Sequence, residues 1–141
     1  MSEPAFRGCK LALIHDGALL VYTRDRKPDI VFPGMIDFPG GGREGEETPE
    51  ECVLRELHEE FGIRLAQERL VYRQRYEIPD SGGFAWFFGG RLFAEEIRNI
   101  RFGDEGSHWQ LIAIEEFLEH PEGISHLKAR LRDCLDAIVG E

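Results

Sequence analysis

Residues 38–63 read FPGGGREGEETPEECVLRELHEEFGI, and this stretch decides the fold that we expect for the chain. Its first part combines proline and glycine, which favours a loop, and its second part carries the signals of a helix. Thr48 is a good N-cap, Pro49 follows at the first helical position, and Glu51 completes a capping box. Gly62 supplies the glycine that commonly ends a helix. The sequence therefore predicts a glycine-rich loop followed by one well-capped helix.

The helix has two distinct faces when its residues are placed about 100° apart. The apolar face, which we expect to enter the core, consists of Val53, Leu54, Leu57 and Phe61. The other face carries Glu56, Glu59 and Glu60, with Cys52 between them as a buried small residue, and Arg55 can pair with Glu59. Three carboxylates this close repel one another unless a cation lies between them, and Mg²⁺ or Mn²⁺ binds such oxygen clusters. We expect these carboxylates to face solvent and metal; a merely solvated acidic face is the alternative.

Nine positions of this stretch resemble the signature of the Nudix hydrolase superfamily, G-x5-E-x7-R-E-U-x-E-E-x-G-U, in which U is aliphatic. The matching residues are Gly41, Glu47, Arg55, Glu56, Leu57, Glu59, Glu60, Gly62 and Ile63. Further segments are similar to the MutT-like branch of that superfamily: residues 38–41, 47–50, 76–80 and 104–106, with Trp109. The resemblance implies an α+β fold, the Nudix fold, in which a mixed β-sheet is sandwiched between α-helices. The length of the chain is that of one domain, so we expect a single Nudix domain over residues 1–141.

The resemblance implies a hydrolase that uses Mg²⁺ or Mn²⁺ to cleave a phosphoanhydride bond. The implied metal ligands are the carbonyl of Gly40 and the carboxylates of Glu56, Glu59, Glu60 and Glu105. Arg55 is implied to orient the carboxylates of the signature, with Glu47 as its supporting partner. A free carboxylate can take the proton of the attacking water. The family uses different glutamates for this step, so Glu59 and Glu56 are our first candidates and Glu105 is the next.

Three residues are candidate substrate contacts: Arg24, Phe38 and Ile78. Arg24 lies where MutT-like proteins place basic residues for phosphate contact, although an ordinary charged loop is the alternative. Phe38 or Ile78 is expected to pack on a nucleobase. MutT proteins that select 8-oxoguanine present an asparagine near the start of the last helix, whereas Asn99 lies in another loop. The sequence therefore argues against strong selection of 8-oxoguanine.

These features predict a MutT-like nucleotide pyrophosphatase that acts on a nucleoside triphosphate or a related small nucleotide. One alternative is a hydrolase of nucleoside diphosphate sugars or dinucleoside polyphosphates. The other is a Nudix module that binds a nucleotide without cleaving it. Such modules usually lack the carboxylates of the signature, and this chain retains all of them.

Composition excludes several classes of protein. The chain has 141 residues and a formal net charge of −10, which disfavours binding to an extended nucleic acid. Its apolar runs, such as those at residues 11–14 and 84–88, are too short to cross a membrane, and its first ten residues lack the apolar stretch of a signal peptide. The three cysteines show no CxxC pair, which suits a reducing compartment. We expect a cytoplasmic protein with a small-molecule partner and no membrane partner, and the sequence makes no prediction of oligomeric state.

The remaining elements follow from hydrophobic patterning and turn residues. We expect strands at 9–15 and 18–24 joined at Asp16-Gly17, a loop over 25–42, strands at 69–78 and 84–93 around a turn at 79–83, an irregular loop over 95–107, a strand at 108–112, a helical turn at 114–118 and a helix at 124–139.

Overall fold

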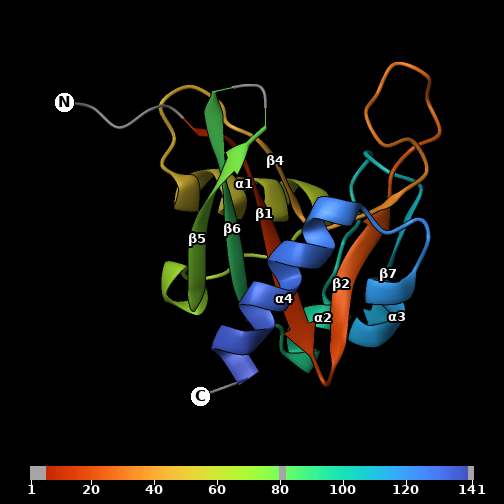
Figure 1. Cartoon of the computed structure of the whole chain (residues 1–141). Coiled ribbons are helices and arrows are strands. Elements are labelled where there is room, and N and C mark those ends of the chain that lie inside the picture. The colour runs from red at the N-terminus through yellow and green to blue at the C-terminus, as the bar shows by residue number, and fades with distance from the viewer. Residues whose placement is uncertain (1–5, 80–81, 140–141) are drawn as a thin grey trace.

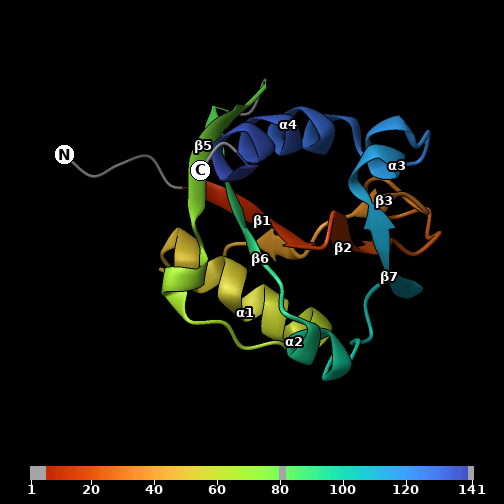
Figure 2. The same cartoon turned by 90° about the horizontal axis from the view of Figure 1, so that it is seen from below.

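The structure is a computed structural model that describes residues 6–79 and 82–139. Its elements are β1 (Phe6–His15), β2 (Ala18–Thr23), β3 (Ile36–Asp37), β4 (Gly40–Gly42), α1 (Pro49–Phe61), a 3-10 helix (Gln67–Arg69), β5 (Tyr72–Ile78), β6 (Gly83–Arg91), α2 (Ala94–Arg98), β7 (His108–Ala113), α3 (Ile114–Glu119) and α4 (Ser125–Val139). In Figures 1 and 2, α4 covers one face of the sheet, and α1 with α2 covers the other. This arrangement confirms the expected mixed sheet between helices. None of the described helices is both long and apolar enough to span a membrane.

The local signals at the helix and at the first hairpin are confirmed. The Thr48 hydroxyl accepts a hydrogen bond from the Glu51 amide at 3.1 Å, and the Glu51 carboxylate accepts one from the Thr48 amide at 2.8 Å. Gly62 ends α1 in the left-handed conformation, with φ of 70°. Asp16 and Gly17 also have positive φ, 47° and 77°, as a two-residue hairpin turn requires. These turns are determined by the residues that form them.

Strand β1 lies in the middle of the sheet, which has the order β3-β2-β1-β6-β5. It pairs in parallel with β6 and antiparallel with β2, but it stays beside β2 only near the hairpin, where Ile14 is opposite Leu19. The two strands then diverge. In the fork between them, Asp37 of β3 lies opposite Tyr22 of β2, and Gly40 of β4 lies opposite Lys10 of β1. The fork therefore holds residues 37–40, where the stretch of residues 38–63 begins with its glycine-rich loop.

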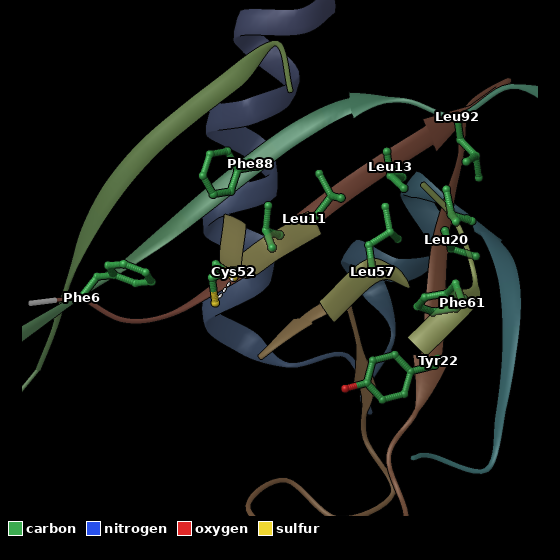
Figure 3. Close-up of a cluster of buried hydrophobic side chains, with 13 residues drawn as sticks. Phe6, Leu11, Leu13, Leu20, Tyr22, Cys52, Leu57, Phe61, Phe88 and Leu92 are labelled. Atoms are coloured by element: carbon green, nitrogen blue, oxygen red, sulfur yellow. Dashed lines mark hydrogen bonds between the residues drawn. The ribbon is translucent and has the colours of Figure 1, made fainter. Parts of the chain in front are cut away.

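Each face of the sheet has its own hydrophobic core. The cluster under α1 is shown in Figure 3 and includes Leu11, Leu13, Leu57, Phe61 and Phe88. The cluster under α4 includes Ala12, Phe38, Phe87, Phe117, Leu127 and Leu131. Because side chains alternate along a strand, Leu11 and Ala12 of β1 enter different clusters. This alternation also determines which polar residues of β1 lie beside α1 and which lie beside α4.

The structure corrects the expected loops. The expected irregular loop over 95–107 begins with the helix α2, which the Glu96 carboxylate caps by accepting a hydrogen bond from the Phe93 amide at 2.9 Å. Arg69 also binds Glu96 at 2.8 Å, so a contact from a distant segment supports this short helix. The expected loop over 25–42 contains the short strands β3 and β4. Part of the expected turn at 79–83 falls on residues 80 and 81, which lie outside the described residues.

Candidate active site

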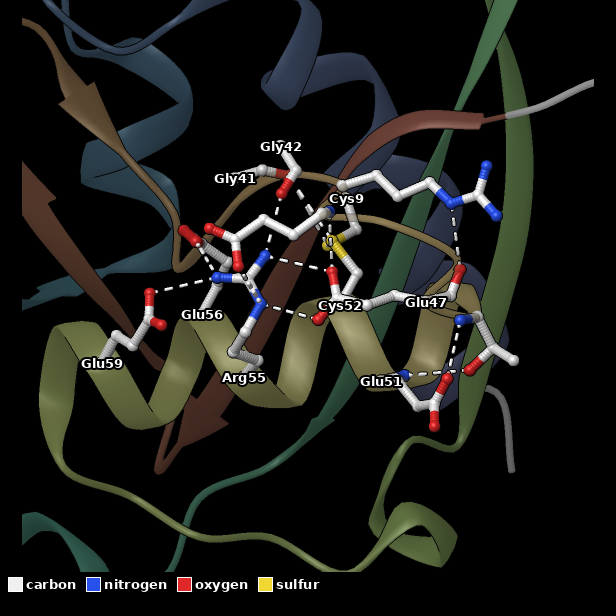
Figure 4. Close-up of polar contacts among 12 residues, drawn as sticks. Cys9, Gly41, Gly42, Glu47, Glu51, Cys52, Arg55, Glu56 and Glu59 are labelled. Atoms are coloured by element: carbon white, nitrogen blue, oxygen red, sulfur yellow. Dashed lines mark hydrogen bonds and ion pairs between the residues drawn. The ribbon is translucent and has the colours of Figure 1, made fainter.

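The guanidinium of Arg55 binds three carboxylates of the candidate site, as Figure 4 shows. Arg55 Nε donates to Glu47 Oε2 at 2.6 Å, and Arg55 Nη1 donates to Glu56 Oε1 at 2.8 Å and to Glu59 Oε1 at 3.0 Å. Arg55 Nη2 reaches the carbonyl of Gly42 at 2.9 Å. The hydrogen bonds from Arg55 hold the pKa of Glu47 below its ordinary value. Arg55 therefore joins the helix to the glycine loop and sets the direction of three carboxylates.

The Glu56 carboxylate packs directly on the glycine loop. A Cβ atom at Gly41 would lie 2.1 Å from Glu56 Oε2, so residue 41 must be a glycine for the carboxylate to keep this place. Burial raises the pKa of Glu56; Arg55 opposes this rise, and the charges of Glu59 and Glu105 add to it. The repulsion indicates that Glu56, Glu59 and Glu105 belong to one cluster of like charges.

The Glu60 carboxylate is buried, which corrects the expectation that all three helical carboxylates face solvent. Glu60 is 6% exposed, whereas the side chain of Glu59 is 55% exposed. Glu60 Oε1 accepts a hydrogen bond from the Gly40 amide at 2.9 Å, and Oε2 is buried with no hydrogen-bond partner among the described residues. Burial raises the pKa of Glu60 to about 8. The orphaned oxygen is costly unless a ligand completes its surroundings.

A buried ion cluster fills the fork beside Glu60. Asp37 is 1% exposed, and its Oδ2 accepts hydrogen bonds from Lys10 Nζ at 2.8 Å, Arg24 Nη1 at 2.9 Å and the Tyr22 hydroxyl at 3.2 Å. Burial by itself would raise the pKa of Asp37, but Lys10, Arg24 and the Phe38 amide hold it below its ordinary value. Lys10 Nζ also lies 3.5 Å from the carbonyl of Gly40. Arg24 is therefore held in place by the fold rather than carried on a free loop.

Sequence reasoning missed Lys10, Tyr22 and Asp37 as members of this site. A signal was present, because Lys10 is the only charge in the apolar run of residues 9–14 and such a charge needs a partner. Nothing in the run identifies Asp37 as that partner. The pairing arises from the divergence of β1 and β2, which is a property of the assembled sheet.

Glu105 lies near the cluster because two glycines seat its loop. The Gly103 amide donates to the Glu60 carbonyl at 2.8 Å, and a Cβ atom at Gly106 would lie 2.7 Å from the ring of Tyr22. Glu105 and Arg24 line one pocket of about 250 Å³. The loop thus places an exposed carboxylate beside a proposed phosphate contact.

The structure separates the two expected base contacts. Phe38 is fully buried and packs against Phe87 and Phe117, with ring centroids 6.0 and 4.9 Å away. It belongs to the core under α4, so we remove it from the candidate substrate contacts. Ile78 lines a different pocket of about 440 Å³, together with Gly41. This pocket opens beside the loop on which the Glu56 carboxylate rests.

The donors at the glycine loop suit a hard divalent cation. Among the described residues, no three His, Cys, Asp or Glu side chains are already arranged around a common metal position. Even so, the Glu56 and Glu60 carboxylates both touch residues 40–41, and one oxygen of Glu60 lacks a partner in the described structure. Carboxylate and carbonyl oxygens are the ligands that Mg²⁺ prefers. The residues present therefore fit a divalent metal, and Arg55 partly balances the charge of Glu56 and Glu59.

Comparisons with known proteins show what the chain resembles in sequence and in fold. The NUDIX domain family model matches residues 9–132. The 8-oxo-dGTP diphosphatase of Escherichia coli (strain K12) is 38% identical over 86 residues, which cover 61% of this chain and 64% of that protein. A MutT protein from Methanosarcina mazei Go1 superposes with a TM-score of 0.69 at 20% identity, covering 92% of this chain and 91% of that chain. A C. elegans Ap4A hydrolase superposes with a TM-score of 0.75 at 15% identity, covering 96% and 100%. The chain spans less than two thirds of the length of the E. coli relative.

Proposed function

The chain belongs to the NUDIX domain family, and from this premise we propose that it is a metal-dependent nucleotide pyrophosphohydrolase of the MutT-like type. Its proposed substrate is a nucleoside triphosphate or a related small nucleotide. The observation that carries the proposal is the pair of carboxylates at the glycine loop, where Glu56 packs on Gly41 and Glu60 binds the Gly40 amide while keeping one buried oxygen unpartnered. A site of this kind is suited to a cation and to the phosphates that the cation attracts.

Nudix hydrolases generally use a divalent metal. We propose that the carbonyl of Gly40 and the carboxylates of Glu56 and Glu60 hold it here, and that Glu59 and Glu105 complete the set. When bound, such a metal neutralises charge on phosphate oxygens and makes a water molecule more acidic. The like-charge repulsion at Glu56 supports this assignment, because a cation in the cluster would relieve it.

The remaining groups bind and orient the substrate and handle its protons. We propose that Arg24, which lines the pocket with Glu105, contacts a phosphate, and that Ile78 packs on the base. Arg55 keeps the carboxylates of Glu56 and Glu59 aligned through its Nη1 atom. Glu59 is our first candidate for general base, because its side chain is 55% exposed and can reach a water. Glu56 is the second candidate and Glu105 the third.

A screen of nucleotides with Mg²⁺ tests the proposal. The substrates are the nucleoside triphosphates, 8-oxo-dGTP, a nucleoside diphosphate sugar and a dinucleoside polyphosphate, and the products are separated by anion-exchange chromatography. We expect a triphosphate to yield a monophosphate and pyrophosphate, and we expect EDTA to abolish the reaction. Cleavage confined to the diphosphate sugar or the dinucleotide would transfer the assignment to the alternative hydrolase. Nucleotide binding without any cleavage would show a binding module instead.

A further inference from the structure

The pocket beside Gly41 is suited in size to a flat ring, and small residues form its floor. Its volume of about 440 Å³ lies between the start of β1, the end of β5 and the first turns of α4. Gly8 and Ala85, which are opposite each other in the β1–β6 pair, both line it, so two adjacent strands present little side chain there. Gly8 has no room for more, because a Cβ atom would lie 2.6 Å from the Gly41 carbonyl oxygen.

The walls of this pocket are more suited to a base than to a phosphate. Ile78 and Pro79 supply apolar surface, and His126 is also part of the lining. Phe32 backs His126 with ring centroids 5.8 Å apart, and it is held there in a left-handed conformation with φ of 52°, which is strained for a phenylalanine. Burial and the nearby Arg130 lower the pKa of His126, so its ring is largely neutral at pH 7.

Arg130 places hydrogen-bond donors in this pocket, which Arg7 and Lys10 also line. Its Cζ lies 4.7 Å from the centroid of the Tyr76 ring, and the Tyr76 hydroxyl donates to Asp133 at 2.8 Å, which keeps the ring in place. Burial lowers the pKa of Arg130, and no group in residues 6–79 and 82–139 accepts a hydrogen bond from its guanidinium. Lys10, in contrast, is engaged by Asp37 and two backbone carbonyls. Arg130 is therefore oriented by stacking, with its donors available to a ligand.

We propose that Arg130 is a specificity-determining residue, which selects nucleobases that carry two adjacent hydrogen-bond acceptors on one edge. A guanidinium presents two parallel N–H groups that match such an edge. The matching edges are N7 with O6 in guanine and hypoxanthine, and O2 with N3 in cytosine. Adenine, uracil and thymine offer no such pair. The base 8-oxoguanine carries a hydrogen on N7, so it loses the purine pair. This inference rests on the proposed function for the identity of the ligand as a nucleotide.

Binding of nucleoside monophosphates tests the inference without requiring turnover. The probes are GMP, IMP, CMP, AMP and UMP, titrated calorimetrically in EDTA into the wild-type protein. The variants are Arg130→Met, which removes the donors, and Arg130→Lys, which keeps the charge but not the two parallel N–H groups. The matched control is Arg132→Met, because Arg132 lies on the exposed side of the same helix. Thermal melting monitored by circular dichroism confirms that each variant is folded.

We expect GMP and IMP, or CMP, to bind the wild type about ten- to a hundredfold more tightly than AMP and UMP, the range for one good two-point contact. Both Arg130 variants should reduce this preference to about twofold, and Arg132→Met should retain it. Weaker binding of 7-deaza-GMP than of GMP would identify the purine N7 edge. Tighter binding of CMP than of the other monophosphates would identify the cytosine edge. The inference is overturned by equal affinities in the wild type, by an equal loss for all five probes in Arg130→Met, or by a preference that survives in Arg130→Lys.

The same ranking should appear in kcat/KM for the corresponding triphosphates. If no triphosphate is cleaved while the binding preference holds, the proposed hydrolase function fails and the role of Arg130 stands. If cleavage is observed without any preference among bases, the hydrolase function stands and the role of Arg130 fails.

Discussion

The two faces of the sheet are built in different ways. On the α1 face, the carboxylates and the arginine that orients them come from one stretch, residues 40–60, and are joined by a dense set of short polar contacts. On the α4 face, the pocket is lined by residues of β1, β4, the β5–β6 hairpin and α4, which lie far apart in the sequence. Under our two proposals, the chemistry is specified by a contiguous motif, whereas selection among substrates is specified by residues that meet only in the folded sheet.

The largest expected effect on activity comes from substitutions of the α1 glutamates alone. Glu59→Gln and Glu60→Gln should each lower kcat by about a thousandfold or more, because each removes a charge that we assign to metal binding or proton transfer. The fold should persist, since glutamine preserves the size of each side chain. Steady-state kinetics with Mg²⁺ measures the effect, and Glu46→Gln on the exposed loop is the matched control. Near wild-type kcat in either variant would show that our ligand assignment is wrong.

Substitution of Glu105 tests whether a residue outside the contiguous motif takes part in catalysis. Glu105→Ala should lower kcat by about a hundredfold, within the range for loss of a general base, with little change in melting temperature. Asp104→Ala is the matched control, because Asp104 is exposed in the same loop, and its effect should be mild. Small and equal effects in both variants would limit the chemistry to the glutamates of α1.

The fork between β1 and β2 connects the two faces, and Asp37 tests its contribution to stability. Asp37→Asn should lower the free energy of unfolding at pH 7 by about 2–4 kcal/mol, because Lys10 and Arg24 lose a buried anion. The folded pKa of Asp37 is below its ordinary value of 3.8, so its stabilising charge is present above that value. The difference between wild type and variant should shrink as the pH falls through the folded pKa.

Urea denaturation at pH 7 and at pH 3 measures both parts of this prediction. Asp136→Asn, an exposed position on α4, should change stability little at either pH. A difference for Asp37→Asn that is as large at pH 3 as at pH 7 would mean that packing, not charge, accounts for it.

The smallest expected effect concerns substrate selection on the α4 face. The ratio of kcat/KM for 8-oxo-dGTP over dGTP should be about ten or less, because no asparagine near the start of α4 offers hydrogen bonds to the oxidised edge. Competition between the two nucleotides in one reaction measures the ratio directly. A preference of a thousandfold or more for the oxidised nucleotide would refute this and would also contradict the role that we propose for Arg130.

Much of the α1 face could be predicted because its signals are local. The cap at Thr48, the glycine at residue 62 and the spacing of the glutamates are readable along the chain, and the structure confirms the helix that they predict. The burial of Glu60 could not be read in the same way. A helical wheel places it beside Glu59, but its environment depends on Gly40, which reaches it only because β4 fills the fork.

The pocket on the α4 face could not be predicted from the sequence. Arg130 lies on an amphipathic helix, where a basic residue normally indicates only a solvated face. Its significance depends on Tyr76, more than fifty residues earlier, and on small residues at positions 8 and 85. Phe38 illustrates the opposite error. Its place in the motif suggested a ligand contact, while its partners Phe87 and Phe117 come from distant segments and draw it into the core.

The parallel pairing of β1 with β6 has a consequence for how the chain folds. Helix α1 carries its own caps and can form early, but the central pair of the sheet joins Phe6 to Phe84, so most of the chain must be brought back on itself before that pair closes. Until β1 and β6 pair, the β1 strand that β4 binds is not yet fixed in the sheet, and the floor of the pocket beside Gly41 is not formed. We therefore expect refolding from urea to be slow compared with that of a helical protein of this size, with helical circular dichroism recovering before nucleotide binding.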